Sequence, residues 1–310
     1  MKLFSFICTF ALCNIIYLTF GCSNQEKILS ELEYTESPVT FDVNTLKYKL
    51  TENTSLWDSD DFQKSFKLNI QLSEAESQNA KKYAKGFSNH LQNGEYYLHY
   101  LVHEIKRKNL PMELAVVPMM ESSFNPRAHS PSGAKGLWQF VNGTGKKMGL
   151  KVSRNYNDFY DFKKSTESAL EYLKFLRSKT QNWNQAIAAY NQGLGSVYNQ
   201  LKSGGLSNSS MQYVNKFRIY ATLLKNHKQY RIQMPKIQNR SKFVHIAIHD
   251  IPSNHRNMQK LAKIGNIDID ILRKLNSGYL SDNLDNHGVL IPSENYSHLI
   301  NKLNVINKFE

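Results

Sequence analysis

Cysteine is scarce in this chain. The 310 residues include only 3 cysteines, Cys8, Cys13 and Cys22, and all of them stand near the N-terminus. If the apolar leader that holds the first two is removed, a single thiol remains. One thiol excludes an internal disulfide and a cysteine-ligated metal site. The stability of the body must therefore come from core packing.

Recognisable metal-ligand patterns are also missing. The 10 histidines show no convincing ligand spacing. His245 and His249 are four residues apart, but they fall in a segment predicted as a strand, where this spacing does not pair them as it does on a helix. We therefore expect no metal and no cofactor. No internal repeat is evident either, so we do not expect a tandem array of modules.

The N-terminus combines a short basic start with a long apolar stretch. This combination is typical of a secretory signal peptide, which we assign to residues 1–21. Gly21 before Cys22 resembles the processing site of bacterial lipoproteins, where the cysteine thiol is acylated and becomes the new N-terminus. We predict lipidation at Cys22, and Ser23 is compatible with sorting to the outer membrane.

Two residues before this site depart from the lipoprotein pattern. Thr19 stands where leucine is usual, and bulky Phe20 stands where a small residue is usual. The alternative is an uncleaved anchor, because residues 3–21 nearly reach the ~20 residues that span a bilayer. Both interpretations place the body outside the cytoplasm, on a membrane of the bacterial cell envelope and facing the periplasm.

Charge is unevenly distributed along the chain. The formal net charge is +13, yet residues 22–75 hold five basic and ten acidic residues, so the rest of the chain is strongly basic. A basic surface could meet nucleic acid, anionic lipid or an acidic polymer. The export signal argues against nucleic acid as a partner, and we expect a monomer.

The pattern of apolar residues divides the exported part into three segments. Residues 22–72 are polar and acidic, which predicts a tether that docks in part on the body and contributes little core. Residues 73–238 show apolar positions at spacings of three and four, which predicts a helical domain with loops at 130–145. The predicted helices are 97–108, 112–121, 163–178, 183–190, 192–202 and 211–227.

Residues 239–310 change period. The sequence alternates like a strand from Phe243, then predicts two short helices at 257–264 and 268–275 and a closing strand at 289–292. The order strand, helix, helix, strand resembles a LysM peptidoglycan-binding module. The alternative is a degenerate subdomain that only packs on the rest of the protein.

Glu121 follows an apolar run and precedes SerSerPheAsnPro and a turn rich in Gly and Ser. A carboxylate placed where an apolar segment stops can be partly desolvated, which raises its pKa and suits it to donate a proton and later take one back. The sequence thus offers Glu121 as a general acid. The alternative is an ordinary solvated acid in the last turn of an amphipathic helix.

Three motifs accompany this acid in order: Glu121-Ser122, GlyLeuTrpGlnPhe at 136–140, and AlaTyrAsnGlnGly at 189–193. Together they resemble the lytic transglycosylase family with a soluble-lytic-transglycosylase, lysozyme-like catalytic domain, and the resemblance covers residues 95–235. It implies an α+β fold, made of a predominantly helical lysozyme-like domain and the small C-terminal module. Within the motifs, Gly136 allows a close backbone approach, and the resemblance implies that Gly193 permits the tight turn before the next helix.

The resemblance also implies a reaction at the β-1,4 bond between MurNAc and GlcNAc in peptidoglycan. In the family a single glutamate protonates the glycosidic oxygen. It then removes the proton from the C6 hydroxyl of the muramic acid, which closes onto C1. Carried over, Glu121 is both acid and base, and the product is a 1,6-anhydro sugar rather than the product of attack by water.

The resemblance further implies residues that hold the glycan strand. It places the Ser122 hydroxyl near the substrate acetamido group, and it places Tyr190, Asn191 and Tyr213 at the saccharide cleft. Gln139 is a binding candidate because its amide can both donate and accept hydrogen bonds. Trp138 and Phe140 of the same motif are more typical of core residues than of a sugar platform.

Two other functions remain open at this stage. Paired-carboxylate hydrolysis needs a second acid, and the nearest in sequence are Glu113, Asp158 and Asp161, none of which is marked for that role. A goose-type muramidase on the same fold would use water as the nucleophile. A non-catalytic wall-binding protein would have no reason to keep this set of polar residues.

Overall fold

The computed structural model describes residues 55–180, 182–237 and 241–307. The predicted signal peptide, the lipidation site Cys22 and most of the predicted tether lie outside the described residues. Within these ranges no helix is both long and apolar enough to cross a membrane. The chain divides into two compact units: the described part of one is Leu176–Val214, and the other is Thr51–Phe175 with Asn215–Glu310.

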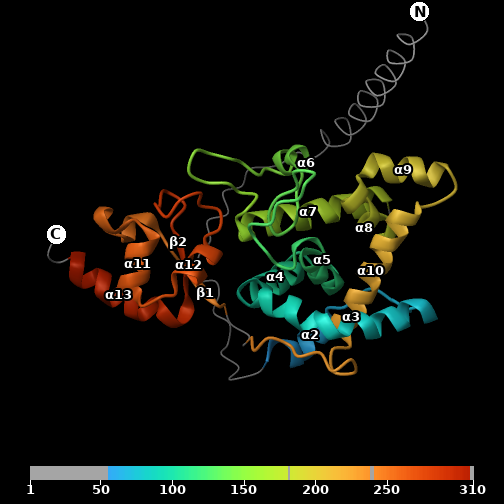
Figure 1. Cartoon of the computed structure of the whole chain (residues 1–310), viewed down its shortest axis with the longest axis horizontal. Coiled ribbons are helices and arrows are strands. Elements are labelled where there is room, and N and C mark those ends of the chain that lie inside the picture. Colours follow the sequence, from blue (N-terminus) through green and yellow to red (C-terminus); the bar gives the residue numbers. More distant parts are fainter. Residues whose placement is uncertain (1–54, 181, 238–240, 308–310) are drawn as a thin grey trace, which may run out of the picture. The chain divides into compact units, whose positions relative to one another are not determined.

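Helices dominate the larger unit, as the sequence predicts. Those before the C-terminal region are α3 (Glu74–Asn93), α4 (Glu95–Arg107), α5 (Val117–Ser122) and α6 (Asn142–Lys147), with most of α7 (Phe162–Thr180) and α10 (Asn208–Lys225). The start of α3 shows why such helices form, because Ser73 and Glu76 cap each other's backbone N–H groups. Apolar side chains of these helices are buried and build the core. Figure 1 shows how the helices are arranged.

The helix predicted from Met112 to Glu121 is interrupted. The segment begins as the 3-10 helix η3 (Met112–Val116) and becomes α-helical only in α5. Pro118, in the first turn of α5, has no N–H to donate, so a continuous hydrogen-bond ladder cannot run through it. The result is a short helix of six residues that carries Glu121 in its last turn.

The expectation of little core before residue 73 is wrong for the part that the structure describes. Residues 56–64 form η2 (Leu56–Asp58) and α2 (Asp60–Lys64). The side chains of Leu56, Trp57 and Phe62 are buried, and the Trp57 ring meets the Phe62 ring edge-on at 5.3 Å. These three apolar side chains hold the acidic segment against the body. The average polarity of the segment does not reveal them.

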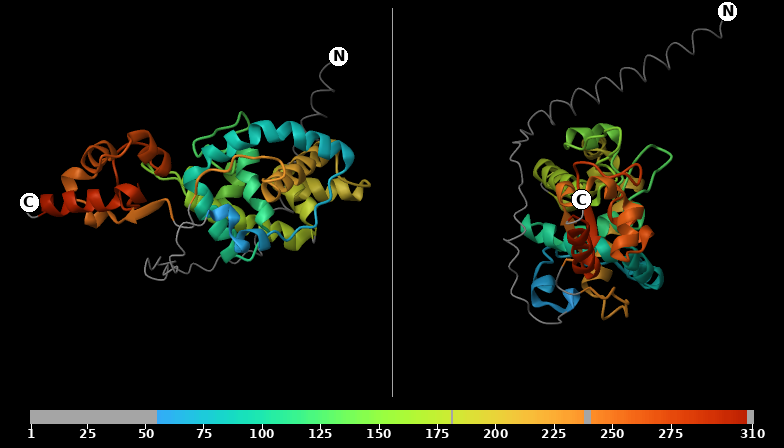
Figure 2. Two further views of the ribbon diagram at one scale, coloured as in Figure 1. Left: turned by 90° about the horizontal axis from the view of Figure 1, so that it is seen from below. Right: turned by 90° about the vertical axis from the view of Figure 1, so that its left-hand side faces the viewer.

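The C-terminal region contains the only described sheet. Strand β1 (Phe243–Ile246) pairs antiparallel with β2 (Val289–Pro292), with Phe243 opposite Pro292. Helices α11 (Met258–Gly265) and α12 (Ile269–Leu275) lie between them in sequence, which confirms the predicted order of strand, helix, helix and strand. The helix after β2, α13 (Ser293–Asn307), was not predicted. Figure 2 shows these orange and red elements gathered together from two further sides.

This C-terminal region shares a core with the loop before α7. Tyr156 belongs to the same apolar cluster as residues of α11, α12, β2 and α13. Its ring stacks on His287 at 3.7 Å and meets Tyr279 edge-on at 4.8 Å. The Asn157 N–H donates to the Gly278 carbonyl at 2.8 Å, and a Cβ at Gly278 would lie 2.4 Å from the Tyr156 ring. The sequence gives no hint of this aromatic contact.

The smaller unit contains the end of α7, helices α8 (Trp183–Gln192) and α9 (Leu194–Lys202), and the start of α10. Residues 186–189 of α8 are buried. Gly193 joins α8 to α9 with φ +85°, a left-handed backbone that glycine adopts without steric cost. The expected tight turn at this glycine is confirmed.

Candidate functional site

Glu121 stands where the buried apolar run ends. Val116, Val117 and Met119 are buried, whereas Met120 and Glu121 are half-buried. The apolar side of η3 and α5 therefore anchors the helix in the core and leaves the glutamate at its edge. The expectation that the apolar segment stops at this residue is confirmed.

The chain turns sharply just after Glu121. Ser123 (φ +53°) and Phe124 (φ +60°) are two consecutive non-glycine residues in the left-handed region. Such residues cost on the order of 1–3 kcal/mol each and persist only where the surroundings enforce them. Here the Phe124 ring is fully buried, and a Cβ on Gly94 would lie only 2.8 Å from it. Strained backbone of this kind gathers at functional sites.

Ser122 ties the catalytic candidate to the GlyLeuTrpGlnPhe turn. Its hydroxyl lies 2.8 Å from the Leu137 carbonyl and 3.2 Å from the Pro118 carbonyl. A hydroxyl has one proton, so its donor capacity is committed to the backbone while its lone pairs can still accept. Ser122 thus positions α5 against residues 136–140, in addition to any contact with a ligand.

Gly136 fixes the shape of that turn. Its φ is +77°, and a Cβ at this position would lie 1.8 Å from the Phe159 carbonyl oxygen. No other residue fits there without moving the backbone of residue 159. The prediction that this glycine allows a close backbone approach is confirmed.

The apolar side chains of the same motif lie in the core. Leu137, Trp138 and Phe140 are buried, and the Trp138 Nε1–H donates to the Thr166 hydroxyl at 2.9 Å. Their interpretation as core residues is confirmed. A buried indole whose N–H has a partner anchors the turn and offers no surface to a sugar.

Gln139 is the half-buried member of the turn. Its Nε2 donates to the Gly136 carbonyl at 2.8 Å, and its backbone has φ +50°. The amide donor is thus used within the turn, whereas Oε1 accepts no hydrogen bond from the residues that the structure describes. Gln139 can therefore offer a ligand an acceptor.

The three carboxylates that could pair with Glu121 are committed elsewhere. Glu113 is 1% exposed, and its Oε1 and Oε2 accept the N–H groups of Leu68 at 2.7 Å and Lys67 at 3.2 Å. Burial raises the pKa of Glu113, and these backbone bonds partly oppose the rise. A carboxylate held in this way is a structural group.

Asp158 and Asp161 are equally occupied. Asp158 accepts the Lys151 N–H at 2.9 Å and the Lys164 Nζ at 2.8 Å. Asp161 accepts the Tyr156 hydroxyl at 2.5 Å, and its other oxygen accepts two N–H groups at the start of α7. Both acids hold the loop before α7 in place, and neither has an oxygen without a partner.

The remaining candidates lie in the smaller unit. Tyr190 and Asn191 stand in the last turn of α8, and Tyr213 stands in α10. The two tyrosines are half-buried, and Asn191 is exposed, with its Oδ1 accepting from Gln192 at 2.6 Å. All three present polar groups at or near the surface of their unit, whereas Glu121, Ser122 and Gln139 belong to the larger unit.

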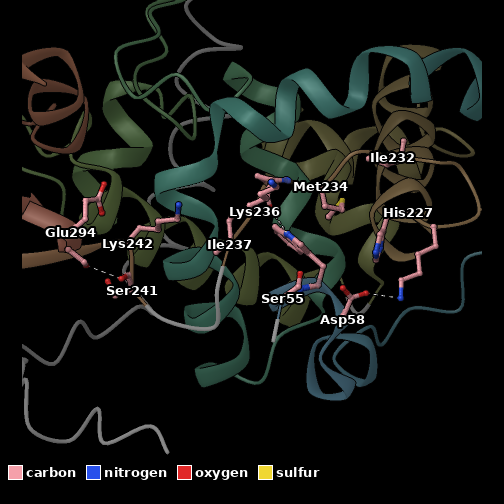
Figure 3. Close-up of a pocket in the computed structure, with 14 residues that line it drawn as sticks. Ser55, Asp58, His227, Ile232, Met234, Lys236, Ile237, Ser241, Lys242 and Glu294 are labelled. Carbon is pink, nitrogen blue, oxygen red and sulfur yellow. Dashed lines mark hydrogen bonds and ion pairs between the residues drawn. The ribbon is translucent and has the colours of Figure 1, made fainter. Parts of the chain in front are cut away.

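Two cavities of the larger unit adjoin regions that the sequence does not single out. The first, about 730 Å³, is lined by residues of 232–237 and 241–242 and by residues of 55–58. Figure 3 shows Asp58 and His227 near one end of it and Lys242 and Glu294 near the other. The Trp57 Nε1–H donates to the Pro235 carbonyl at 2.7 Å, so this cavity marks where the two segments are joined. Glu121 does not line it.

The second cavity, about 740 Å³, begins two residues after Glu121. Residues 123–127 line it from one side, and α12 and residues 280–282 line it from the other. No sequence signal marks it, because its two walls come from segments more than 130 residues apart. Among the described residues no cluster of His, Cys, Asp and Glu is suited to hold a metal ion.

Comparison with known proteins assigns a family to part of the chain. Residues 101–211 match the family model described as transglycosylase SLT domain. Membrane-bound lytic murein transglycosylase D of Escherichia coli K12 is 30% identical over 221 residues, which are 66% of this chain and 48% of the relative. A protein named for tributyltin chloride resistance from Alteromonas sp. strain M-1 is 40% identical over 104 residues, 33% of this chain and 50% of the relative.

Other relatives match shorter parts. Membrane-bound lytic murein transglycosylase F of Shewanella pealeana is 33% identical over 123 residues, 38% of this chain and 25% of the relative. The solved structure of an inactive mutant of lytic transglycosylase Slt from Pseudomonas aeruginosa is 25% identical, covers 44% of this chain and 25% of its own, and has a TM-score of 0.36. The chain spans about half the length, or less, of the curated relatives it matches.

Proposed function

We propose that this chain, whose residues 101–211 form a transglycosylase SLT domain, is a lytic transglycosylase that cleaves the β-1,4 bond between MurNAc and GlcNAc in peptidoglycan. Glu121 is its single general acid and base. It protonates the glycosidic oxygen as the bond to C1 breaks. It then takes the proton of the C6 hydroxyl as that oxygen closes onto C1, and the product carries a 1,6-anhydro ring.

The observation that supports this proposal most is that the three carboxylates considered as partners of Glu121 are engaged in other hydrogen bonds. A paired-carboxylate hydrolase needs a second acid as nucleophile or base. Glu113, Asp158 and Asp161 each spend both oxygens on backbone or side-chain donors. A reaction that recycles one glutamate needs none of them.

Binding roles follow from the groups that remain available. We propose that the Ser122 hydroxyl oxygen accepts a hydrogen bond from the acetamido N–H of the substrate. The hydroxyl's own proton is already donated to the backbone. Gln139 accepts from a sugar hydroxyl through Oε1. Tyr190, Asn191 and Tyr213 bind saccharide with the polar groups that they present on the smaller unit.

The rest of the chain serves the same substrate in this proposal. The relatives named membrane-bound lytic murein transglycosylases support a place in the cell envelope. A lipid on Cys22 would anchor the protein, as a monomer, to the outer membrane. The strand–helix–helix–strand region at 239–310 would bind peptidoglycan as a LysM-like module, and its observed element order supports that role.

Product chemistry tests the proposal. Purified peptidoglycan is digested with the full chain in detergent, reduced with borohydride and analysed by mass spectrometry, with Glu121→Gln as the matched control. We expect non-reducible 1,6-anhydro ends from the native chain and none from the variant. Reducible MurNAc ends would instead identify a muramidase, and binding without any cleavage would identify a wall-binding protein.

A further inference from the structure

We infer that the cavity beside the catalytic helix is a glycan subsite that the C-terminal region helps to build. This junction groove is the cavity of about 740 Å³ between residues 123–127 and the elements α12 and 280–282. It takes a neutral N-acetylhexosamine unit of the strand beyond the bond that is cut. The inference rests on the proposed function, because it assumes that the strand passes Glu121.

The groove begins close to the candidate catalytic residue in the chain. Ser123, which lines it, is the second residue after Glu121, so the backbone at the start of the groove lies within about 7 Å of the backbone of the acid. The volume is in the range of pockets that enclose small ligands. In this inference, a strand held at Glu121 extends its next units into the groove.

The two walls of the groove are joined by protein contacts. An Arg127 Nη2–H donates to the Tyr279 carbonyl, and the Arg127 guanidinium lies 5.7 Å from the centre of the Tyr160 ring. The left-handed pair Ser123–Phe124 fixes the other end of the same loop. The groove is thus preformed, which lowers the entropic cost of binding.

The polar groups of the groove suit hydroxyl groups. Arg273 donates from Nε to Asp282 Oδ1 at 2.9 Å and from Nη2 to Asp282 Oδ2 at 2.6 Å. Gln259 donates to the same carboxylate at 2.8 Å. The hydrogen bonds from Arg273 lower the pKa of Asp282, so this acid stays ionised. A fixed, part-exposed guanidinium–carboxylate pair offers donors and acceptors side by side, which is what a sugar requires.

The charges that line the groove nearly balance, because three cations, Arg127, Arg273 and Lys274, stand with two carboxylates, Asp270 and Asp282. Arg273 is paired with Asp282 at 2.6 Å and also lies 3.8 Å from Asp270, so its charge is compensated within the wall. This near balance favours a neutral ligand over an anionic stem peptide. Leu280, which also lines the groove, is 44% exposed, and it offers a surface to the apolar face of a pyranose ring.

The test measures binding in the Glu121→Gln background, so that ligand is not consumed. The probes are β-1,4-linked oligomers of N-acetylglucosamine, a dimer and a hexamer, titrated calorimetrically against the full chain. We expect Arg273→Ala and Leu280→Ser each to weaken hexamer binding about tenfold and to leave dimer binding unchanged. Lys263→Ala, an exposed residue of α11 outside the groove, is the matched control. Unchanged melting temperatures show that the variants fold.

Cleavage assays separate this inference from the proposed function. If the otherwise native chain cuts peptidoglycan but both groove variants bind the hexamer normally, the groove is not a subsite. If the native chain yields no 1,6-anhydro ends, the proposed function fails first. Peptidoglycan from which an amidase has removed the stem peptides distinguishes a sugar ligand from a peptide ligand. If the groove variants cleave intact peptidoglycan more slowly but cleave this stripped substrate normally, the groove binds the peptide and the inference is overturned.

Discussion

Two glutamates eight residues apart, Glu113 in η3 and Glu121 in α5, have different environments in the same segment. Glu113 is 1% exposed, and both its oxygens accept backbone N–H groups of residues 67 and 68. Glu121 is half-buried in the last turn of a six-residue helix, just before two left-handed residues. The first joins two distant segments, whereas the second stands half-buried at the end of a helix.

The difference shows that burial alone does not make a carboxylate catalytic. A buried acid whose oxygens are saturated by N–H groups has no lone pair in a position to act on a ligand, whatever its pKa. The neighbourhood of Glu121 is constrained through the left-handed residues that follow it and through Gly136.

Activity separates the two glutamates most strongly. We expect Glu121→Gln to lower the rate of peptidoglycan cleavage on the order of 10³-fold or more, because one group supplies both proton transfers. Glu113→Gln should lower the rate per folded molecule less than about threefold, since general acid–base assistance is not its role. Release of soluble muropeptides, normalised to folded protein, measures both. Equal losses of cleavage rate in the two variants would contradict the assignment of different roles to Glu113 and Glu121.

The effect on stability should be larger for the Glu113 variant than for the Glu121 variant. Glu113→Gln replaces one acceptor with an NH₂ group that faces a backbone N–H, so we expect a loss of about 2 kcal/mol in the free energy of unfolding. Glu121→Gln should change that free energy by less than about 0.5 kcal/mol. Urea unfolding followed by circular dichroism gives both values. A Glu121 variant that unfolds as easily as the Glu113 variant would mean that Glu121 also has a structural role.

The pH dependence of stability adds a third glutamate to the comparison. Burial works to raise the pKa of Glu104, but hydrogen bonds from His103 and Arg107 outweigh it and lower the pKa from 4.5 to about 2. The folded state then binds this proton less readily than the unfolded state, so its stabilising contribution is complete above 4.5 and is lost as the pH falls toward 2.

Glu113 acts with the opposite sign. Its pKa is raised by burial, so the folded state takes up the proton first and gains stability as the pH falls through the raised value toward 4.5. Unfolding measured between about pH 3 and pH 6 should therefore show a shallower acid loss in Glu104→Gln and a steeper one in Glu113→Gln than in the native chain. Parallel profiles for all three proteins would contradict these assignments.

The smallest expected effect concerns Ser122, the neighbour of Glu121. Ser122→Ala removes the bond from α5 to the Leu137 carbonyl and should cost about 1 kcal/mol of stability. If the hydroxyl also accepts from the substrate acetamido group, KM should rise, whereas a purely structural role would leave KM unchanged. Ser132→Ala, in the loop after Pro126, is a control for loss of an exposed hydroxyl.

Local patterns predicted the helices well because their signals lie within a few residues. Apolar spacing placed α8 and α10 within three residues of their observed starts, and the strand at 289–292 was placed as observed. The glycines Gly136 and Gly193 were assigned correctly, because a positive φ has a direct signature in residue type.

The features that sequence missed depend on distant partners. Glu113 stood as a possible catalytic neighbour until its bonds to residues 67 and 68, some 45 residues away, showed its role. The burial of Trp57 depends on a carbonyl at residue 235, and the junction groove on segments 123–127 and 270–282. Periodicity within one element carries no information about which element it meets.

The stack of Tyr156 on His287 has a consequence for how this architecture can be recombined. If the segment from β1 onward were moved to another protein, it would lack Tyr156, whose ring packs against His287 and Tyr279. A transferable unit would have to carry the loop before α7 as well. The C-terminal region is thus complete as a packing unit only together with the loop that it packs on.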